Sequence, residues 1–413
     1  MVYVINKNGK PLMPCSSCKA KNLLKHKKAR VINRDPFTIK LLWDCEENIQ
    51  EVVAGMDSGS KTIGCAAIAN NKVVYQAEIQ IRDDVSKKMQ QRANYRRSRR
   101  SRKIRHRKPR FLNRANSKKE GRLPPSIKSK INSHLREKKF VESILPVNKW
   151  VVETANFDIQ KINNSQVSGA DYQNGPQKGF YNTKAYVLKR DNYTCQSCGK
   201  KNCKLEVHHI VFQSKGGTNM PENLITLCED CHKKVHNGKI IIKGAKKNYK
   251  NETKINIIKS QLNKKWNFIE TFGYLTKYKR EQLLKLSKTH ANDAIAICYN
   301  EDTLPPKKLK TIYYKRHVSS GDYQQTKGVR SEKRIPTGKL FGFRKFDLIK
   351  TPKGVGFVKG KRSSGHFAIC NIFNKTIETS VNIKKETKRI AARSTTILKS
   401  QFLPELKLQG FLG

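Results

Sequence analysis

The chain has 413 residues, and its 86 Lys or Arg against 32 Asp or Glu give a formal net charge of +54. Such a length suggests two to four domains with at least one large core. The charge far exceeds what solubility requires and favours a long nucleic acid as partner, because neutralising many phosphates needs many cations. The sequence has no apolar run of about 18 residues and no apolar segment behind its N-terminus, so we expect neither a membrane span nor a signal peptide.

Eleven cysteines, several of them in C-x-x-C pairs, indicate a reducing compartment and metal binding rather than disulfides. Residues 1–48 predict a small unit with strand-like ends, a short basic helix near residues 20–28 and a strand pair near residues 30–42. Cys15 and Cys18 lie here without a second pair nearby. A zinc site and two ordinary thiols therefore both remain open.

Three strands are predicted within residues 51–82, with a turn at Asn70 and Asn71. Asp57 lies in the first strand, inside an apolar run. A buried lone carboxylate is costly unless a cation compensates it, so Asp57 is a candidate metal ligand. The alternative is that an Asp before Ser-Gly simply caps a turn.

More than half of residues 87–110 are Lys or Arg, and none is acidic. Good helix formers, with no Gly or Pro before Pro109, predict a helix that ends near residues 106–108. Its arginines point all around the axis, so it has no face to bury and needs a surrounding polyanion. A disordered basic arm or a targeting signal is the alternative. The side chains expected to contact phosphates are Arg92, Arg96, Arg97, Arg99, Arg100, Arg102, Lys103, Arg105 and Arg107.

Residues 126–145 have helical spacing, and the apolar strand that follows carries Glu153. Two strands with one acid each, Asp57 and Glu153, resemble the ribonuclease-H-like fold, in which neighbouring central strands bring carboxylates together around divalent metal. The alternative is that Glu153 ends its strand facing water.

His290 and Asp293 lie three positions apart, on one face at the start of an apolar helix. With Asp57 and Glu153 they resemble the split RuvC motifs. That resemblance implies a site in which two Mg²⁺ ions clamp an in-line phosphodiester hydrolysis by water.

Residues 186–237 carry the most specific motif of the chain. Two C-x-x-C pairs have the spacing of a closed tetrahedral zinc site, made by Cys195, Cys198, Cys228 and Cys231. Around them lie His208, His209 and Asn223, and then His232 and His236, whose i, i+4 spacing places both imidazoles on one helical face.

This combination resembles the HNH nucleases and their ββα-metal fold. The resemblance implies that His209 is the general base and that Asn223 supports the loop and orientation of that histidine. It also implies one catalytic divalent ion on His208 and His232, with His236 as a third ligand. Some family members have Asp in place of His208, so the metal can differ. The alternative is a zinc ribbon that only binds nucleic acid.

The segment 243–285 is Lys-rich and predicts a helix over residues 253–262 and a strand over 268–277. Residues 305–413 consist of short strands and Gly turns in which apolar and basic residues alternate. They predict a twisted β-unit with a cationic face that binds but performs no chemistry.

The order of these motifs, with a PLMP segment at 11–14 and RRSRR at 96–100, resembles the transposon-encoded IscB family, relatives of type II CRISPR effectors. The implied fold is α/β, a ribonuclease-H-like RuvC core split in three, with an inserted ββα-metal HNH zinc domain, an arginine-rich bridge helix and a C-terminal β-rich domain. The implied segments are the PLMP domain (1–48), RuvC-I (49–83), bridge helix (84–115), RuvC-II (116–170), HNH (171–242), RuvC-III (243–303) and a domain that reads a target-adjacent motif (304–413).

The resemblance further implies a cytoplasmic, nucleoid-associated prokaryotic protein that acts as a monomeric ribonucleoprotein. It would carry a guide, the ωRNA, and cut double-stranded DNA, with HNH cleaving the guide-paired strand and RuvC the displaced one. Its cofactors would be two Mg²⁺ at RuvC, one at HNH, and structural Zn²⁺. The alternatives are an unguided HNH/RuvC endonuclease and a nucleic-acid-binding protein that does not cut.

Overall fold

The protein is described from a computed structural model, which covers residues 1–100, 122–154, 177–213, 217, 219–242, 250–321, 342–362, 364–382 and 386–402. The chain forms two compact units. The first comprises residues 1–155 and 257–413, and the second, residues 156–256, is inserted into the sequence of the first.

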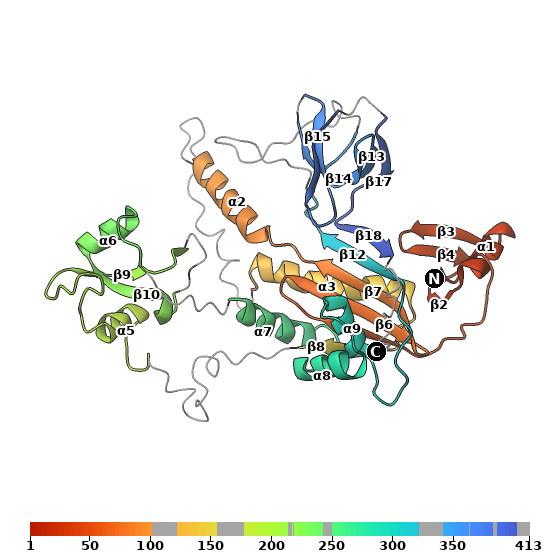
Figure 1. The fold of residues 1–413 in the computed structure, drawn as a ribbon, viewed down its shortest axis with the longest axis horizontal. Coiled ribbons are helices and arrows are strands. Elements are labelled where there is room, and N and C mark those ends of the chain that lie inside the picture. The colour runs from red at the N-terminus through yellow and green to blue at the C-terminus, as the bar shows by residue number, and fades with distance from the viewer. Residues whose placement is uncertain are drawn as a thin grey trace, which may run out of the picture. The chain divides into compact units, whose positions relative to one another are not determined.

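The first unit is built on a seven-stranded mixed sheet of order β11-β8-β5-β6-β7-β12-β18 (Figure 1). In that order the strands are Ile269–Thr271, Lys149–Glu153, Val52–Asp57, Thr62–Ala69, Lys72–Gln80, Thr311–His317 and Thr396–Phe402. The predicted meander is confirmed, because β5, β6 and β7 pair antiparallel. Asn70 and Asn71 form its second turn with φ of 46° and 52°, a conformation that Asn tolerates well.

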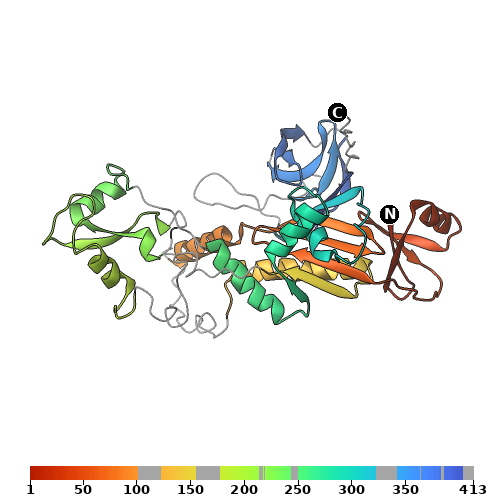
Figure 2. The same ribbon diagram turned by 60° about the horizontal axis from the view of Figure 1, so that its bottom comes forward.

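Two helices cover opposite faces of this sheet, α3 (Pro125–Ile144) and α9 (His290–Cys298) (Figures 1 and 2). Successive side chains of a strand point to opposite faces. In β5, Met56 accordingly packs in the cluster with Ile131 of α3, whereas Val53 packs with Ala294 of α9. The sheet is therefore buried on both sides, which explains why its strands read as nearly continuous apolar runs.

Two glycines let α9 lie directly on the sheet. A methyl group at Gly64 would lie 1.8 Å from the backbone oxygen of His290. At Gly55 it would lie 2.6 Å from Cys298 Sγ. Any larger residue at either position would push the helix away from strands β5 and β6.

The outer strand β11 joins the sheet through a crossover. Helix α7 (Lys250–Asn263) precedes β11, which pairs parallel with β8. The predicted strand over 268–277 is wrong beyond Thr271, because the chain turns into helix α8 (Gly273–Tyr278) and a short π-helix (Lys279–Leu283). An edge strand has a partner on one side only, so its extended form can end as soon as pairing with β8 ends.

Two smaller sheets complete the first unit. The N-terminal sheet has the order β2-β1-β4-β3, and the predicted helix there is α1 (Ser17–Lys25). Its strands are Pro11–Cys15, Val2–Ile5, Phe37–Leu41 and Ala29–Arg34. Cys15 is half-buried and Cys18 exposed, and neither belongs to a metal-capable group among the described residues.

The predicted C-terminal β-unit is a five-stranded sheet of order β16-β15-β14-β13-β17. Its strands are Thr376–Asn382, His366–Cys370, Gly354–Lys361, Leu348–Thr351 and Lys388–Ala391. The structure divides the segment 304–413 between two sheets, because β12 pairs with β7 and β18 pairs with β12 in the large sheet. In the part of the chain described, no helix is both long and apolar enough to cross a membrane.

The basic stretch begins as predicted with helix α2 (Val85–Arg100). Arg92, Arg96 and Arg97 are exposed along it. The expected continuation to residues 106–108, and with it Arg102, Lys103, Arg105 and Arg107, lies outside the described residues, as do the side chains of Arg99 and Arg100.

The second unit contains a hairpin flanked by helices. Strands β9 (Leu205–His209) and β10 (Leu224–Cys228) pair antiparallel, with α5 (Thr183–Arg190) and α6 (Glu229–His236) beside them. Its only apolar cluster among the described residues includes Leu227 and three of the cysteines of the predicted zinc site. A core of this size needs a further crosslink, which a metal can supply.

Polar side chains of α3 are buried beneath the large sheet. The Glu137 carboxylate accepts hydrogen bonds from Lys315 Nζ at 2.8 and 2.9 Å and from the Tyr75 hydroxyl at 2.6 Å. These groups satisfy one another, as a buried ion pair requires. One turn earlier, burial lowers the pKa of His134 to about 4, and its Nε2 has no hydrogen-bond partner among the described residues.

We predict that His134 makes the first unit acid-sensitive. Its pKa is lowered on folding from the ordinary 6.5, so below that pH the unfolded chain binds a proton that the folded chain excludes. The free energy of unfolding should therefore fall with decreasing pH, by about 1.4 kcal/mol per pH unit from this residue. Urea unfolding, followed by fluorescence of the Trp150–Trp266 pair, whose ring centroids are 5.0 Å apart, should show a shallower pH slope for His134→Gln. An unchanged slope between pH 6.5 and 4 would contradict the prediction.

Candidate functional site

The second unit brings together the four cysteines of the two C-x-x-C pairs. Their sulfur atoms all lie within 4.8 Å of one another, and the Sγ atoms of Cys198 and Cys228 are 3.7 Å apart. Cys195, Cys228 and Cys231 are buried, and Cys198 is exposed. Four sulfurs at this spacing can bind a structural zinc ion in a closed site.

A second group in the same unit consists of His208, His232 and His236, whose ring nitrogens also lie within 4.8 Å of one another. His208 comes from β9 and the other two from α6. The Nε2 atom of His208 is buried without a hydrogen-bond partner among the described residues. Burial, and then the two neighbouring imidazoles, lower the pKa of His208 to about 4, which keeps it neutral. Three imidazole nitrogens can hold a divalent ion and leave a coordination position open, as catalytic sites do.

His209 lies outside this group, because side chains alternate along β9. Its Nε2 is 2.8 Å from Asn219 Oδ1 and 3.3 Å from Gln213 Nε2. Asn223 closes the loop after the strand: its Oδ1 accepts from the backbone nitrogen of Val211 at 2.9 Å, and its Nδ2 donates to the oxygen of the same residue at 3.1 Å. These two hydrogen bonds tie the Asn223 side chain to the backbone of the loop that follows β9.

The sequence reasoning missed Glu206, two residues before His208 on the same face of β9. Its Oε2 lies 2.8 Å from Nδ1 of His232. A carboxylate in this position fixes the ring so that Nδ1 carries the proton and Nε2 is directed to a metal. The E-x-H alternation on a strand was the available signal, since it places both side chains on one face.

We predict that Glu206→Ala weakens binding of a divalent ion to the histidine group by about 10- to 100-fold, because His232 loses the acceptor that orients it. Isothermal titration with Mn²⁺ on zinc-loaded protein would measure this. Glu206→Gln should retain most of the affinity, because its amide oxygen can accept the same hydrogen bond. Glu222→Ala is the control, since it removes a carboxylate of the same unit outside both metal groups, and equal affinity of Glu206→Ala and this control would refute the role.

The first unit places the two strand-borne acids side by side. Asp57 and Glu153 are the last residues of β5 and β8, and they are register partners in this parallel pair. The Ser58 hydroxyl donates to the backbone oxygen of Glu153 at 2.6 Å, which ties the two strand ends together. The predicted approach of these carboxylates therefore follows from strand pairing alone.

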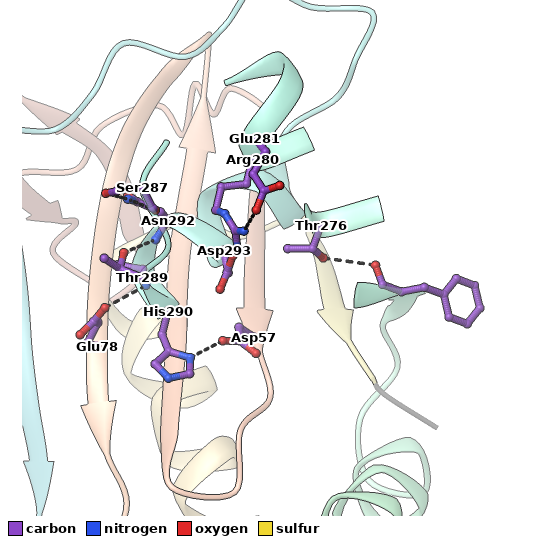
Figure 3. Close-up of polar contacts among 12 residues, drawn as sticks. Asp57, Glu78, Thr276, Arg280, Glu281, Ser287, Thr289, His290, Asn292 and Asp293 are labelled. Carbon is purple, nitrogen blue, oxygen red and sulfur yellow. Dashed lines mark hydrogen bonds and ion pairs between the residues drawn. The ribbon is translucent and has the colours of Figure 1, made fainter. Parts of the chain in front are cut away.

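Helix α9 adds the other two predicted residues. His290 Nδ1 lies 2.6 Å from Asp57 Oδ2, and Asp57, His290 and Asp293 form a metal-capable group with ligand atoms within 4.8 Å (Figure 3). The hydroxyl of Thr289 caps the helix by accepting from the backbone nitrogen of Asn292 at 3.1 Å. This cap and the glycine contacts fix the first turn over the end of β5.

Glu153 lies beside this group without being part of it. Burial raises its pKa, and the charges of Asp57 and Asp293 act in the same direction, while a hydrogen bond with Thr276 opposes them. The hydrogen bond to Asp57 raises the pKa of His290 and favours its protonated form. A crowded set of carboxylates with a proton or cation between them suits an oxygen-binding ion such as Mg²⁺.

Arg280 is a second residue that the sequence reasoning missed. It lies on the π-helix, its side chain is buried, and it forms ion pairs with Asp293 and Glu281 (Figure 3). The ion pair holds one oxygen of Asp293 and leaves the other for a ligand. An arginine in a chain this basic gives no sequence signal of its own, so the structure alone reveals it.

Comparison with known proteins finds matches in two parts of the chain. Residues 2–175 match the family model described as RRXRR protein, and residues 195–238 match the model described as HNH endonuclease. The type IV methyl-directed restriction enzyme EcoKMcrA of Escherichia coli K12 is 36% identical over 64 residues, which cover 14% of this chain and 23% of that enzyme. Anaredoxin of a Nostoc species is 38% identical over 56 residues, which cover 14% of this chain and 74% of anaredoxin. The chain thus spans about a quarter of the restriction enzyme's length.

Proposed function

We propose that this chain, whose residues 195–238 match the HNH endonuclease model, is an RNA-guided DNA endonuclease that makes double-strand breaks. The observation that carries the proposal is the presence of two groups suited to a catalytic ion, one in each compact unit and both distinct from the cysteine group, on a chain of net charge +54. Two strands require two cuts, and two centres of different chemistry can each serve one strand.

In the HNH unit, His209 acts as general base toward water, while Asn223 supports its loop. His208, His232 and His236 would hold a divalent ion, which would supply Lewis-acid stabilisation of the transition-state charge and of the leaving oxygen. His208, buried and neutral, offers its unpartnered Nε2 to this ion. We assign the guide-paired strand to this unit.

In the first unit, the paired strand ends, the helix α9 and the mixed sheet support a ribonuclease-H-like RuvC core. Asp57, Glu153, His290 and Asp293 would hold two Mg²⁺ ions, which would supply charge neutralisation for in-line hydrolysis by water. Arg280 positions Asp293 through their ion pair. We assign the displaced strand to this site.

A guide RNA is supported by charge. An unguided nuclease that touches a short duplex needs few cations, whereas a protein that wraps an RNA and a heteroduplex needs many. The exposed arginines of α2 lie within the RRXRR match. We propose that this helix is a bridge helix that grips phosphates of the guide.

We predict that the protein, expressed with the DNA that flanks its gene, retains a discrete RNA through a wash at high salt, because many phosphate contacts release counterions together. Extraction and sequencing of the bound RNA would check this. Protein that is free of RNA and still cleaves a defined site would refute the guide.

A second prediction concerns the division of labour. Asp57→Ala should leave nicking of the guide-paired strand only, and His209→Ala nicking of the displaced strand only, because each change removes one centre. Strand-specific end labels on a target plasmid would measure both cuts. The zinc content should stay at wild-type level in both variants, and loss of both cuts in either folded variant would contradict two independent centres.

An unguided endonuclease is the second candidate, and the likeness of the HNH unit to a methyl-directed restriction enzyme favours it. It predicts cleavage of methylated DNA by protein stripped of RNA, which the same plasmid assay detects on methylated and unmethylated targets.

A further inference from the structure

An aromatic surface lies beside the carboxylate site of the first unit. Phe272 and Tyr274 have parallel rings, with centroids 6.0 Å apart and an interplanar angle of 10°. Tyr274 is 70% exposed, and Phe272 and Tyr278 are each 48% exposed. Tyr274 and Tyr278 are spaced i, i+4 on α8 and therefore lie on one face of it. We call these three side chains the aromatic ladder.

The ladder is held against the site by the residues between its members. Gly273 separates the two stacked rings, and a methyl group there would lie 3.1 Å from Oε1 of Glu153. The Thr276 hydroxyl, one turn along α8, donates to the backbone oxygen of Phe272 at 3.3 Å, and Thr276 also lowers the pKa of Glu153 against the effect of burial. The ladder thus flanks a carboxylate of the proposed reaction centre through the same short helix.

Contiguous exposed aromatic side chains often mark a binding surface, whereas exposed rings scattered singly need no such explanation. None of the three side chains belongs to the large apolar core of the first unit. The helix also carries Lys277, which is exposed next to Tyr278. Flat rings with a neighbouring cation are the surface that binds single-stranded nucleic acid, because every base has a face that can stack and every linkage has a phosphate.

We propose that the aromatic ladder binds unpaired bases of the DNA strand that the carboxylate site cleaves. The inference rests on the proposed function for the identity of that strand. Stacking on Phe272 and Tyr274 would hold a nucleotide next to the scissile phosphate, which must lie at Glu153 and Asp57. A duplex cannot use this surface, since its bases are already stacked, so the ladder selects single-stranded substrate.

The test combines cleavage with crosslinking. A single-stranded oligonucleotide that carries 5-iododeoxyuridine would be irradiated with the full-length Asp57→Ala protein, and the crosslinked peptide would be identified by mass spectrometry. We expect crosslinks at Tyr274 or Phe272. A matching oligonucleotide with abasic positions, at equal phosphate charge, would compete poorly for this crosslink.

For cleavage, Tyr274→Ala in the otherwise wild-type protein should raise KM for metal-dependent cleavage of the single strand about tenfold, with a smaller change in kcat. Tyr274→Phe should behave as wild type, because stacking needs the ring and not the hydroxyl. Tyr181→Ala is the matched control, since Tyr181 is 96% exposed in the other unit. The HNH cut should be unchanged in all three variants.

The outcomes separate the two proposals. Crosslinks at the ladder, without any guided cleavage, would support base binding by the aromatic ladder and refute the proposal that a guide RNA directs cleavage. Guided cleavage with crosslinks elsewhere, or with equal KM for Tyr274→Ala and Tyr181→Ala, would refute base stacking on the aromatic ladder. The same result would still agree with RNA-guided cleavage. A Tyr274→Phe variant as defective as Tyr274→Ala would also refute stacking, because it would assign the effect to the hydroxyl.

Discussion

The contact between α9 and the sheet at Gly55 and Gly64 is the constraint on which the carboxylate site depends. Asp57 and Glu153 are placed by strand pairing, but His290 and Asp293 reach them only because the helix lies directly on the strand backbones. A side chain at Gly64 would have to displace the backbone of His290 itself. The absence of a side chain at these two glycines therefore determines where His290 and Asp293 lie. This requirement concerns the close approach of backbones and not the chemistry of the ligands.

The two units position their metal-capable groups by opposite means. In the inserted unit, the sulfur and nitrogen atoms come from a small hairpin and one helix, so a zinc ion bound by the cysteines would contribute to folding, whereas the histidine group is suited to an open site. In the first unit, a large apolar core fixes the ligands before any ion arrives, and Arg280 supplies positive charge among the carboxylates. A buried arginine is suited to this, because its guanidinium stays charged and binds a carboxylate in a fixed geometry.

Much of this arrangement could be predicted from local sequence patterns. Apolar runs bounded by turn residues predicted the meander of β5 to β7, and the C-x-x-C spacing predicted the cysteine group. Both features depend on neighbours along the chain. Glu206 and Arg280 were missed, since their roles come from partners on other elements. The end of β11 after Thr271 was also missed, because edge pairing and not propensity determines it. Strands β12 and β18 joined the large sheet through pairings distant in sequence that no local pattern reveals.

The inserted unit occupies the connection between two parallel neighbours, β8 and β11, whose crossover is completed by α7. The entropy of closing a connection grows only with the logarithm of its length, so a folded insertion there adds little to the cost of forming the sheet. The core can thus be regarded as a βαβ unit that tolerates the insertion of a folded unit. Exchange of the inserted unit for another domain, or its replacement by a short linker, would leave the strand register intact. A protein of this design could therefore acquire or lose the inserted unit without a change in the fold of its core.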